Sequence, residues 1–329
     1  MVRSLPLRVA PHPGEGLDSY LETLAARHHA TWGSLLIATG LTRHTSGQRA
    51  VPSWLRTLPT ECAHDLHTSC AVDATLLQSM TLAALLDPAG ETRCTPASLA
   101  SQCLLPARSR FCPACLADTA GRWQLWWRLR WAFLCPTHRC LLADTCPRCS
   151  RWQRTGPHPR GLVPTPTRCS RATDTLHGLA LPRCGADLTA PRPTHLAGKA
   201  VVAAQLRILT VYRDGCASFG VYGAHPVSAA QFTAELSDLA ARILCSPTTE
   251  AAARLLPPDL RATYRQCVTD GSSHPWHTAT PGPRAADTAV AALVAMHALT
   301  VADAAVAGAS PRPRASPPRR LALTVVDSA

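Results

Sequence analysis

Two sets of paired cysteines constrain this chain more than any other feature of its sequence. The first set is Cys112-x2-Cys115, followed after nineteen residues by Cys135-x2-His138. Two short chelating turns that each supply two ligands are typical of a closed tetrahedral Zn²⁺ site, with ligands at about 2.0–2.3 Å. We therefore predict a structural zinc site at these four residues, without an open coordination position for catalysis.

A second set follows at once and repeats the first. Cys146, Cys149 and Cys169 reproduce three of the four positions after a shift of 34 residues, which indicates an internal repeat of a metal-binding module. The fourth position of the repeat is an alanine, so another residue must complete the site. The candidates are Cys184, His177 and His158.

We favour Cys184 as the fourth ligand, because a glycine follows it, as it often follows cysteines of zinc knuckles. Cys140, two residues beyond His138, is a competing ligand for the first site. A redox role for the CxxC pairs is the alternative, but that role is expected beside a βαβ pattern, which this sequence lacks. The other cysteines stand singly and are predicted to be small core residues: Cys62, Cys70, Cys94, Cys103, Cys216, Cys245 and Cys267.

The positive charge of the chain is concentrated in the same segment. The formal net charge is +12, and residues 108–183 hold thirteen arginines against three acidic residues. Bound Zn²⁺ leaves a site with three thiolates at −1 and one with four thiolates at −2, so the segment stays basic. A concentrated positive charge of this kind predicts an anionic partner, and we expect DNA.

The hydrophobic pattern divides the chain into three folded parts and a tail. We predict an N-terminal helical domain with a helix-turn-helix (1–107), a tandem zinc-binding segment (108–190), a C-terminal helical domain (191–304) and a disordered Pro/Arg-rich tail (305–329). The fold class is therefore mainly α, with a small zinc-stabilised, β-containing middle segment. An ordinary helical bundle is the alternative to the helix-turn-helix, since apolar spacing does not reveal whether a helix enters a DNA groove.

The predicted helices rest on apolar stripes. Short stripes between residues 17 and 40 and between residues 58 and 84 predict two pairs of N-terminal helices, although Ser69-Cys70-Ala71 lacks the glycine expected in a turn. C-terminal helices are predicted around Leu206, after a cap at Ser228, around Tyr264, and over 290–301.

The stretch from Arg122 to Phe133 alternates between apolar and polar residues, which favours a strand over a helix. Its polar side would carry the arginines for contacts with DNA phosphates. These are Arg122, Arg128 and Arg130.

Several other functions lack their signatures. The only Gly-Lys pair has no P-loop around it, and neither HExxH nor GxSxG occurs. We expect no enzyme activity. Residues 1–11 lack the apolar core of a secretory leader, and the longest apolar run is far short of about 20 residues, so we expect a soluble, cytoplasmic protein with no membrane partner.

The order of these motifs resembles the TniQ family, which comprises accessory and target-selection proteins of multi-subunit bacterial transposons. The resemblance covers about residues 5–190. It rests on Leu5-Pro6-Leu7-Arg8, Pro13-Gly14-Glu15, Leu17-Asp18-Ser19-Tyr20-Leu21, Met80-Thr81-Leu82, Arg110-Phe111-Cys112-Pro113-Ala114-Cys115, Trp123-Gln124-Leu125, Cys135-Pro136-Thr137-His138, Leu141-Leu142, Cys146-Pro147-Arg148-Cys149 and Cys184-Gly185-Ala186-Asp187-Leu188.

The resemblance implies that the protein is a zinc-binding, DNA-binding adaptor that helps to select target sites. Such an adaptor recruits other transposition proteins and does not catalyse a reaction itself. The implied partners are DNA, a transposase and its AAA+ ATPase regulator, and a homodimer is left open. The alternative function is a transcriptional regulator with zinc fingers and a helix-turn-helix. A metal-dependent hydrolase or nuclease is the third class, and it would need an open metal site.

Overall fold

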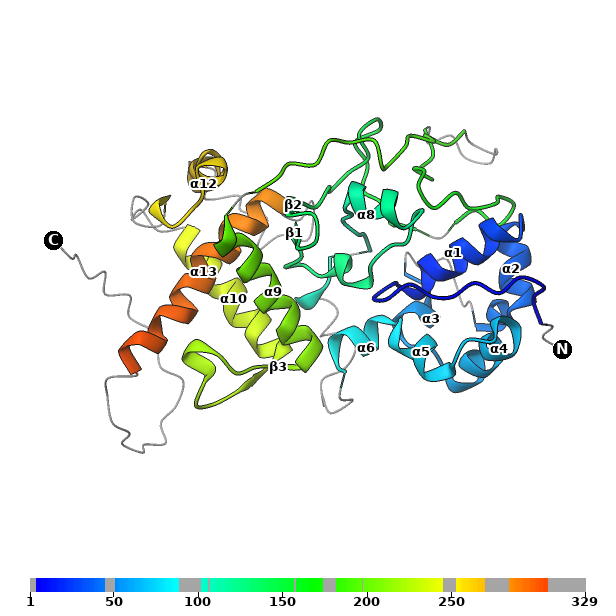
Figure 1. Cartoon of the computed structure of the whole chain (residues 1–329), viewed down its shortest axis with the longest axis horizontal. Coiled ribbons are helices and arrows are strands. Elements are labelled where there is room, and N and C mark those ends of the chain that lie inside the picture. Colours follow the sequence, from blue (N-terminus) through cyan, green and yellow to red (C-terminus); the bar gives the residue numbers. More distant parts are fainter. Residues whose placement is uncertain are drawn as a thin grey trace.

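The computed structural model has the predicted mainly helical fold, with small two-stranded sheets (Figure 1). The N-terminal helices lie at one end and the C-terminal helices at the other, with the cysteine-rich segment between them (Figure 1). The structure describes residues 4–44, 51–88, 102–105, 107–156, 158–173, 182–196, 198–244, 253–269 and 284–306.

The N-terminal part is a group of short helices with a common core. Helix α1 and helix α2 contact one another, and their leucines are buried. The Thr31 side chain caps α2 by accepting a hydrogen bond from the backbone N–H of Ser34. The elements are α1 (Leu17–Arg27), α2 (Trp32–Ala38), η1 (Leu41–His44), α3 (Ser53–Arg56), α4 (Thr60–Cys70), α5 (Ala74–Ser79) and α6 (Leu82–Leu86).

The apolar residues between 76 and 84, predicted to lie on one helix, are divided between helices α5 and α6. Helix α5 ends before Met80, and Thr81 caps α6 through a 3.5 Å hydrogen bond from the Ala84 N–H. The turn between α4 and α5 places Ala71 at φ 54°, in the left-handed region that favours glycine. The turn therefore keeps the backbone conformation that usually needs a glycine, and Ala71 adopts it with strain.

The predicted strand from Arg122 to Phe133 is wrong. Four of its residues form the 3-10 helix η2 (Leu125–Arg128), and single bridges join Gln124 to Glu15 and Leu129 to Leu104. The alternating apolar side chains are buried as predicted, but successive backbone groups bond to different elements instead of one neighbouring strand. The regular elements of the middle segment are α8 (Pro113–Asp118), η2, β1 (Leu134–Cys135) and β2 (Cys140–Leu141).

The C-terminal part contains the longest helices. Helix α13 contacts α9, α10 and α12. Ser228 caps α10 as predicted, since its hydroxyl accepts the Gln231 N–H at 3.2 Å. The elements are α9 (Lys199–Asp214), β3 (Cys216–Ala217), η3 (Gly220–Tyr222), β4 (Val227–Ser228), α10 (Ala229–Leu244), α12 (Pro258–Thr269) and α13 (Ala285–Val306). Residues 307–329, which include most of the predicted tail, lie outside the described residues.

Buried polar contacts fasten the C-terminal helices to the middle segment. Asp144 accepts hydrogen bonds from the Ala285 N–H at the start of α13 and from the fully buried guanidinium of Arg110. The side-chain oxygen of Gln205 on α9 accepts hydrogen bonds from the N–H groups of Phe133 and Leu134. The cysteine-rich segment is thus fastened to both α9 and α13.

Candidate metal centres and nucleic-acid interface

The first predicted ligand set comes together from α8 and the β1–β2 hairpin. Cys112 precedes α8 and Cys115 lies within it, while Cys135 ends β1 and His138 lies in the hairpin turn. The four ligand atoms all lie within 4.8 Å of one another. His138 Nδ1 lies 3.2 Å from Cys115 Sγ and 3.5 Å from the sulfurs of Cys112 and Cys135.

These separations fit a tetrahedral metal site. Two sulfurs bound to Zn²⁺ at ~2.3 Å lie roughly 3.8 Å apart, and a sulfur and a nitrogen lie roughly 3.5 Å apart. The Cys115 and Cys135 sulfurs are 3.5 Å apart. The residues present therefore suit a four-coordinate ion, and the donor set of three thiols and an imidazole suits Zn²⁺.

Asp118 supports this cluster, although the sequence analysis did not single it out. Its carboxylate lies 2.8 Å from His138 Nε2, on the side of the ring that faces away from the cysteines. A carboxylate at this position orients the imidazole and keeps Nδ1 available for a metal. Asp118 lies one turn beyond Ala114 on α8, and a search for acidic residues near the chelating turn could have found it.

Cys140 is a fifth thiol beside the first cluster. It pairs with Cys135 in the β1–β2 register, and its sulfur lies 3.7 Å from that of Cys112. The group of four mutually close ligand atoms contains His138 and not Cys140. Hydrogen bonding from the Cys115 thiol lowers the pKa of Cys112 to about 7, and neighbouring thiols also lower the pKa of Cys135. The same neighbours raise the pKa values of Cys115 and Cys140, so without a metal the thiolate form, which binds metal, is favoured at Cys112 and Cys135 only.

The second ligand set also comes together, and Cys184 is its fourth member. The Cys146 and Cys184 sulfurs are 3.7 Å apart, and the Cys149 and Cys169 sulfurs are 3.8 Å apart. All four sulfurs lie within 4.8 Å of one another, so the edge lengths suit a four-thiolate zinc site. The other candidates do not join them: His158 bonds to Glu22, and His177 lies outside the described residues.

Single bridges and polar contacts hold the second cluster in place. Bridges join Thr145 to Trp152 and Arg168 to Asp187. The amide nitrogen of Gln153, a buried residue, donates to Cys169 Sγ at 3.5 Å, and the Arg148 N–H donates to Cys146 Sγ at 3.4 Å. Such outer contacts orient thiolates and offset their charge.

The three arginines predicted to contact DNA do not form an exposed face. The side chain of Arg122 is 13% exposed and pairs with Glu15 at 2.8 Å, and that of Arg128 is 7% exposed and pairs with Asp18. Arg130 is partly buried, and burial lowers its pKa. The predicted face is missing because the strand that would display it does not form.

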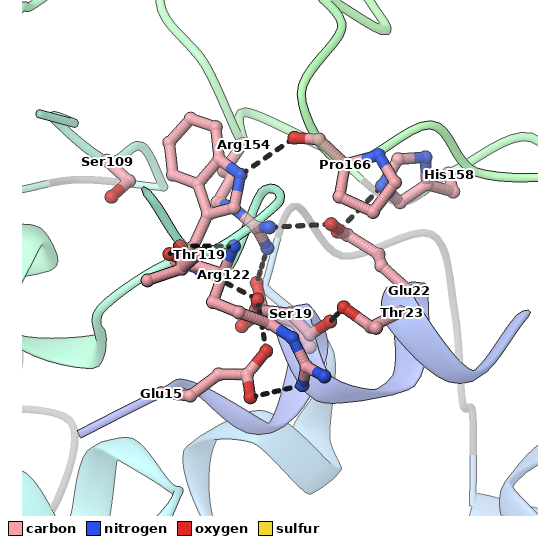
Figure 2. A network of polar contacts seen from close by, with 12 residues as sticks. Glu15, Ser19, Glu22, Thr23, Ser109, Thr119, Arg122, Arg154, His158 and Pro166 are labelled. Atoms are coloured by element: carbon pink, nitrogen blue, oxygen red, sulfur yellow. Dashed lines mark hydrogen bonds and ion pairs between the residues drawn. The ribbon is translucent and has the colours of Figure 1, made fainter. Parts of the chain in front are cut away.

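These contacts belong to a network that joins α1 to the cysteine-rich segment (Figure 2). Arg154 donates to both Asp18 and Glu22, and His158 lies 2.7 Å from Glu22 (Figure 2 shows the Glu22 contacts). Burial alone would raise the pKa values of Asp18 and Glu22, but the attraction of Arg154, aided by Arg128 and by His158, outweighs it and lowers both. The two carboxylates are therefore ionised, and both are paired with cationic side chains inside the protein.

Two glycines lie where loops of the cysteine-rich segment come close to neighbouring parts of the chain. At Gly121, a Cβ would lie 2.6 Å from the Pro166 Cβ, and the φ of +94° is also unfavourable for other residues. At Gly33 in α2, a Cβ would lie 3.0 Å from the Arg160 carbonyl oxygen. The loops around the second cluster thus pack directly on the turn that follows α8 and on α2.

This packing affects the predicted helix-turn-helix. Helices α1 and α2 have the expected order, but the Trp32 and Gly33 N–H groups at the start of α2 donate to the carbonyls of Leu162 and Arg160. The start of a second helix is the part that a helix-turn-helix presents to DNA bases. In this structure residues 160–162 occupy that position.

A different set of arginines surrounds the second cluster. We call residues 108–144 the first module and residues 145–190 the second module. Five arginines of the second module donate to neutral oxygens, and none takes part in an ion pair between described residues. The five arginines and their acceptors are Arg148 with Cys184 O, Arg151 with Ala172 O, Arg168 with Gly185 O, Arg171 with Thr155 Oγ1, and Arg183 with Ser170 O.

The fold and the clusters define a mainly helical protein with two four-ligand groups that could hold metal ions. The model of the TniQ family matches residues 6–142, so this part of the chain is a TniQ family domain. The match includes the N-terminal helices and all but the last two residues of the first module, and thus crosses the division expected at residue 107. No curated protein matches the chain. Among the described residues, no helix is both long and apolar enough to cross a bilayer.

Proposed function

We propose that this chain is a non-enzymatic, zinc-binding adaptor of DNA transposition that binds DNA and recruits the ATPase regulator of a transposase. The TniQ domain supports the place in transposition. The eight clustered ligands support two structural zinc ions, because each group of four fills the coordination shell and leaves no position for a substrate. The TniQ match over residues 6–142 joins the predicted domain 1–107 to the first part of 108–190, and we propose that the parts 191–304 and 305–329 remain as predicted.

The observation that carries DNA binding is the set of five second-module arginines that bond only to neutral oxygens. A carbonyl oxygen orients a guanidinium without cancelling its charge, whereas a carboxylate cancels it. Among the described residues of the second module, Asp187 is the one carboxylate, and its Oδ1 accepts hydrogen bonds from the backbone N–H and hydroxyl of Thr189. Oriented, uncompensated guanidinium groups suit phosphate oxygens.

We therefore propose the second module as the DNA interface, in place of the first-module arginines predicted from the sequence. Arg122, Arg128 and Arg130 take structural roles, and three exposed second-module arginines replace them as the proposed phosphate contacts. These are Arg148, Arg168 and Arg183.

Complementation of a deletion strain tests the adaptor role. One plasmid carries Arg148→Gln, Arg168→Gln and Arg183→Gln together, and a matched control carries Arg207→Gln, Arg254→Gln and Arg261→Gln on the exposed C-terminal helices. Both triple variants lose three positive charges. We expect the first to lose the bias in insertion sites that the wild type and the control restore, while the ATPase still co-purifies with all three.

Two outcomes would contradict the proposal. An unchanged distribution of insertions in the deletion strain would remove the adaptor role and leave the transcriptional regulator as the better function. Normal insertion with the second-module variant but not with the control would place the DNA contacts on the C-terminal helices.

A further inference from the structure

A small cleft lies where the N-terminal helices meet the second module. Its volume is about 80 Å³, and it opens beside the network of Figure 2. The helices contribute Asp18, Glu22 and Trp54, and the second module contributes Arg171 and Arg183. The sequence analysis and the proposed zinc sites do not account for this cleft.

The negative groups of the cleft are already neutralised. Asp18 pairs with Arg128 and Arg154, and Glu22 pairs with Arg154 and His158. Two carboxylates thus offset the two paired arginines.

Arg171 and Arg183 add two further positive charges to the cleft. They donate to a threonine hydroxyl and a carbonyl oxygen, and neither pairs with a carboxylate among the described residues. The cleft therefore keeps a net positive charge.

Three donors of the residues that line the cleft lack an acceptor among the described residues, and one of them is the Nε–H of Arg154. Trp54 is 1% exposed, and none of the described residues accepts a hydrogen bond from its indole N–H. The Nε–H of Arg171 is also buried and unpaired in the described part of the chain. Buried donors are almost always paired in folded proteins, so these unpaired donors around a positively charged cleft favour a ligand with acceptor oxygens.

We propose that this cleft binds one phosphate group of a nucleic-acid backbone. A phosphate accepts several hydrogen bonds at once and matches the planar guanidinium donors of Arg171 and Arg183. The volume of about 80 Å³ is sufficient for a phosphate group. Arg148 and Arg168 of the second module bond to the carbonyls of Cys184 and Gly185, the two residues that follow Arg183, so further positive charge lies close to the cleft and suits a polyanion better than a single carboxylate.

The inference rests on the proposed DNA binding and adds a specific anchor to it. A phosphate in the cleft would contact α3 and the second module together. It would therefore fix the orientation of the bound strand relative to the TniQ domain.

The Trp54 indole resonance provides a direct readout. Full-length, zinc-loaded protein labelled with ¹⁵N-tryptophan is titrated with inorganic phosphate at constant ionic strength, and Trp54→Phe assigns the signal. We expect a saturable shift of the Trp54 Nε1–H signal. Half-saturation should require at least tenfold more phosphate in Arg171→Gln and in Arg183→Gln, and the same amount in Arg192→Gln, an exposed control.

A second titration identifies the source of the phosphate. A short DNA duplex that shifts the same resonance, and whose effect is lost in Arg183→Gln, supports a backbone phosphate. Phosphate binding without any effect of DNA would overturn the nucleic-acid source and indicate a small phosphorylated ligand.

The cleft and the proposed function fail separately. Arg183 is exposed, so its variant is expected to fold, and zinc content and circular dichroism check this. If the Trp54 signal does not shift at tens of millimolar phosphate while DNA binding is intact, the proposed phosphate site is wrong and the proposed function stands. The unpaired donors of the cleft would then bind water. Loss of DNA binding in the wild type would instead overturn the proposed function.

Discussion

The two modules have similar ligand spacing but differ in the partners of most of their arginines. In the first module Arg110, Arg122 and Arg128 pair with Asp144, Glu15 and Asp18. In the second module, the five arginines described above bond to carbonyl or hydroxyl oxygens. The first module thus uses three of its arginines in ion pairs that hold the fold together. In the second module Arg154 has the same role, since it pairs with Asp18 and Glu22, whereas the five arginines described above form no ion pair with a described residue.

This difference teaches that net charge alone does not locate an interface. Both modules are basic in sequence, yet only uncompensated and accessible charge attracts a polyanion. The partners of each arginine, rather than the number of arginines, separate a structural module from a binding one.

The largest expected effect comes from loss of a zinc ligand, and it should differ between the modules. Apparent zinc binding of ~10–16 kcal/mol is as large as the whole stability of a domain. We expect Cys135→Ala to lower the zinc content from two to one and to unfold the TniQ domain, because the first module is part of its core. Cys169→Ala should also lose one zinc but leave that domain folded, and metal analysis with hydrogen exchange measures both.

Equal unfolding by both substitutions would break the comparison, since it would make the second module part of the same cooperative core. A zinc content of one in freshly purified wild type would contradict the tandem sites.

Removal of the Asp18 charge should have the next largest effect. Asp18→Asn leaves Arg128 and Arg154 without their shared carboxylate in a buried site, which costs about 3–5 kcal/mol in comparable pairs. The free energy of unfolding by urea measures this loss. The control is Asp238→Asn, whose exposed pair with Arg242 should contribute less than about 0.5 kcal/mol. A small effect of Asp18→Asn would mean that the network does not anchor α1.

Substitution of Asp118 should distinguish the zinc affinities of the two sites. Asp118→Asn removes the carboxylate that orients His138, and we expect zinc affinity at the first site to fall about 10–100-fold. The second site, which has no histidine, should keep its affinity. Competition with a chelator measures the two sites, and an equal loss at both would show that the carboxylate acts on general stability.

The smallest effect is a gradual dependence on pH. The pKa values of Asp18 and Glu22 lie below their ordinary values of 3.8 and 4.5, so the folded state binds fewer protons than the unfolded state. Their stabilisation is therefore fully present above about pH 4.5 and is lost as the pH falls through the lowered pKa values. Urea unfolding in acid, with zinc content measured in each sample, tests this. Asp18→Asn should show a shallower decline, and an identical decline would contradict the assignment.

The local parts of this structure could be predicted from the sequence, and the long-range parts could not. Chelating turns such as Cys112-x2-Cys115 and a cap such as Ser228 depend on neighbouring residues only. The pairs of Arg122 with Glu15 and Arg154 with Asp18 join residues 107 and 136 positions apart. The alternating apolar side chains of residues 123–133 are buried, but alternation did not predict that Arg128 of the polar side is buried too, nor that a strand partner is absent from the described fold.

The salt dependence of DNA affinity tests the central claim most directly. Each phosphate contact contributes about 0.9 to the slope of log K against log salt concentration. The variant with Arg148→Gln, Arg168→Gln and Arg183→Gln should bind more weakly, with a slope shallower by about 3 if all three contact phosphate. The matched control, with Arg207→Gln, Arg254→Gln and Arg261→Gln, should keep the wild-type slope. An unchanged slope in the second-module variant would contradict the claim that its uncompensated arginines form the DNA interface.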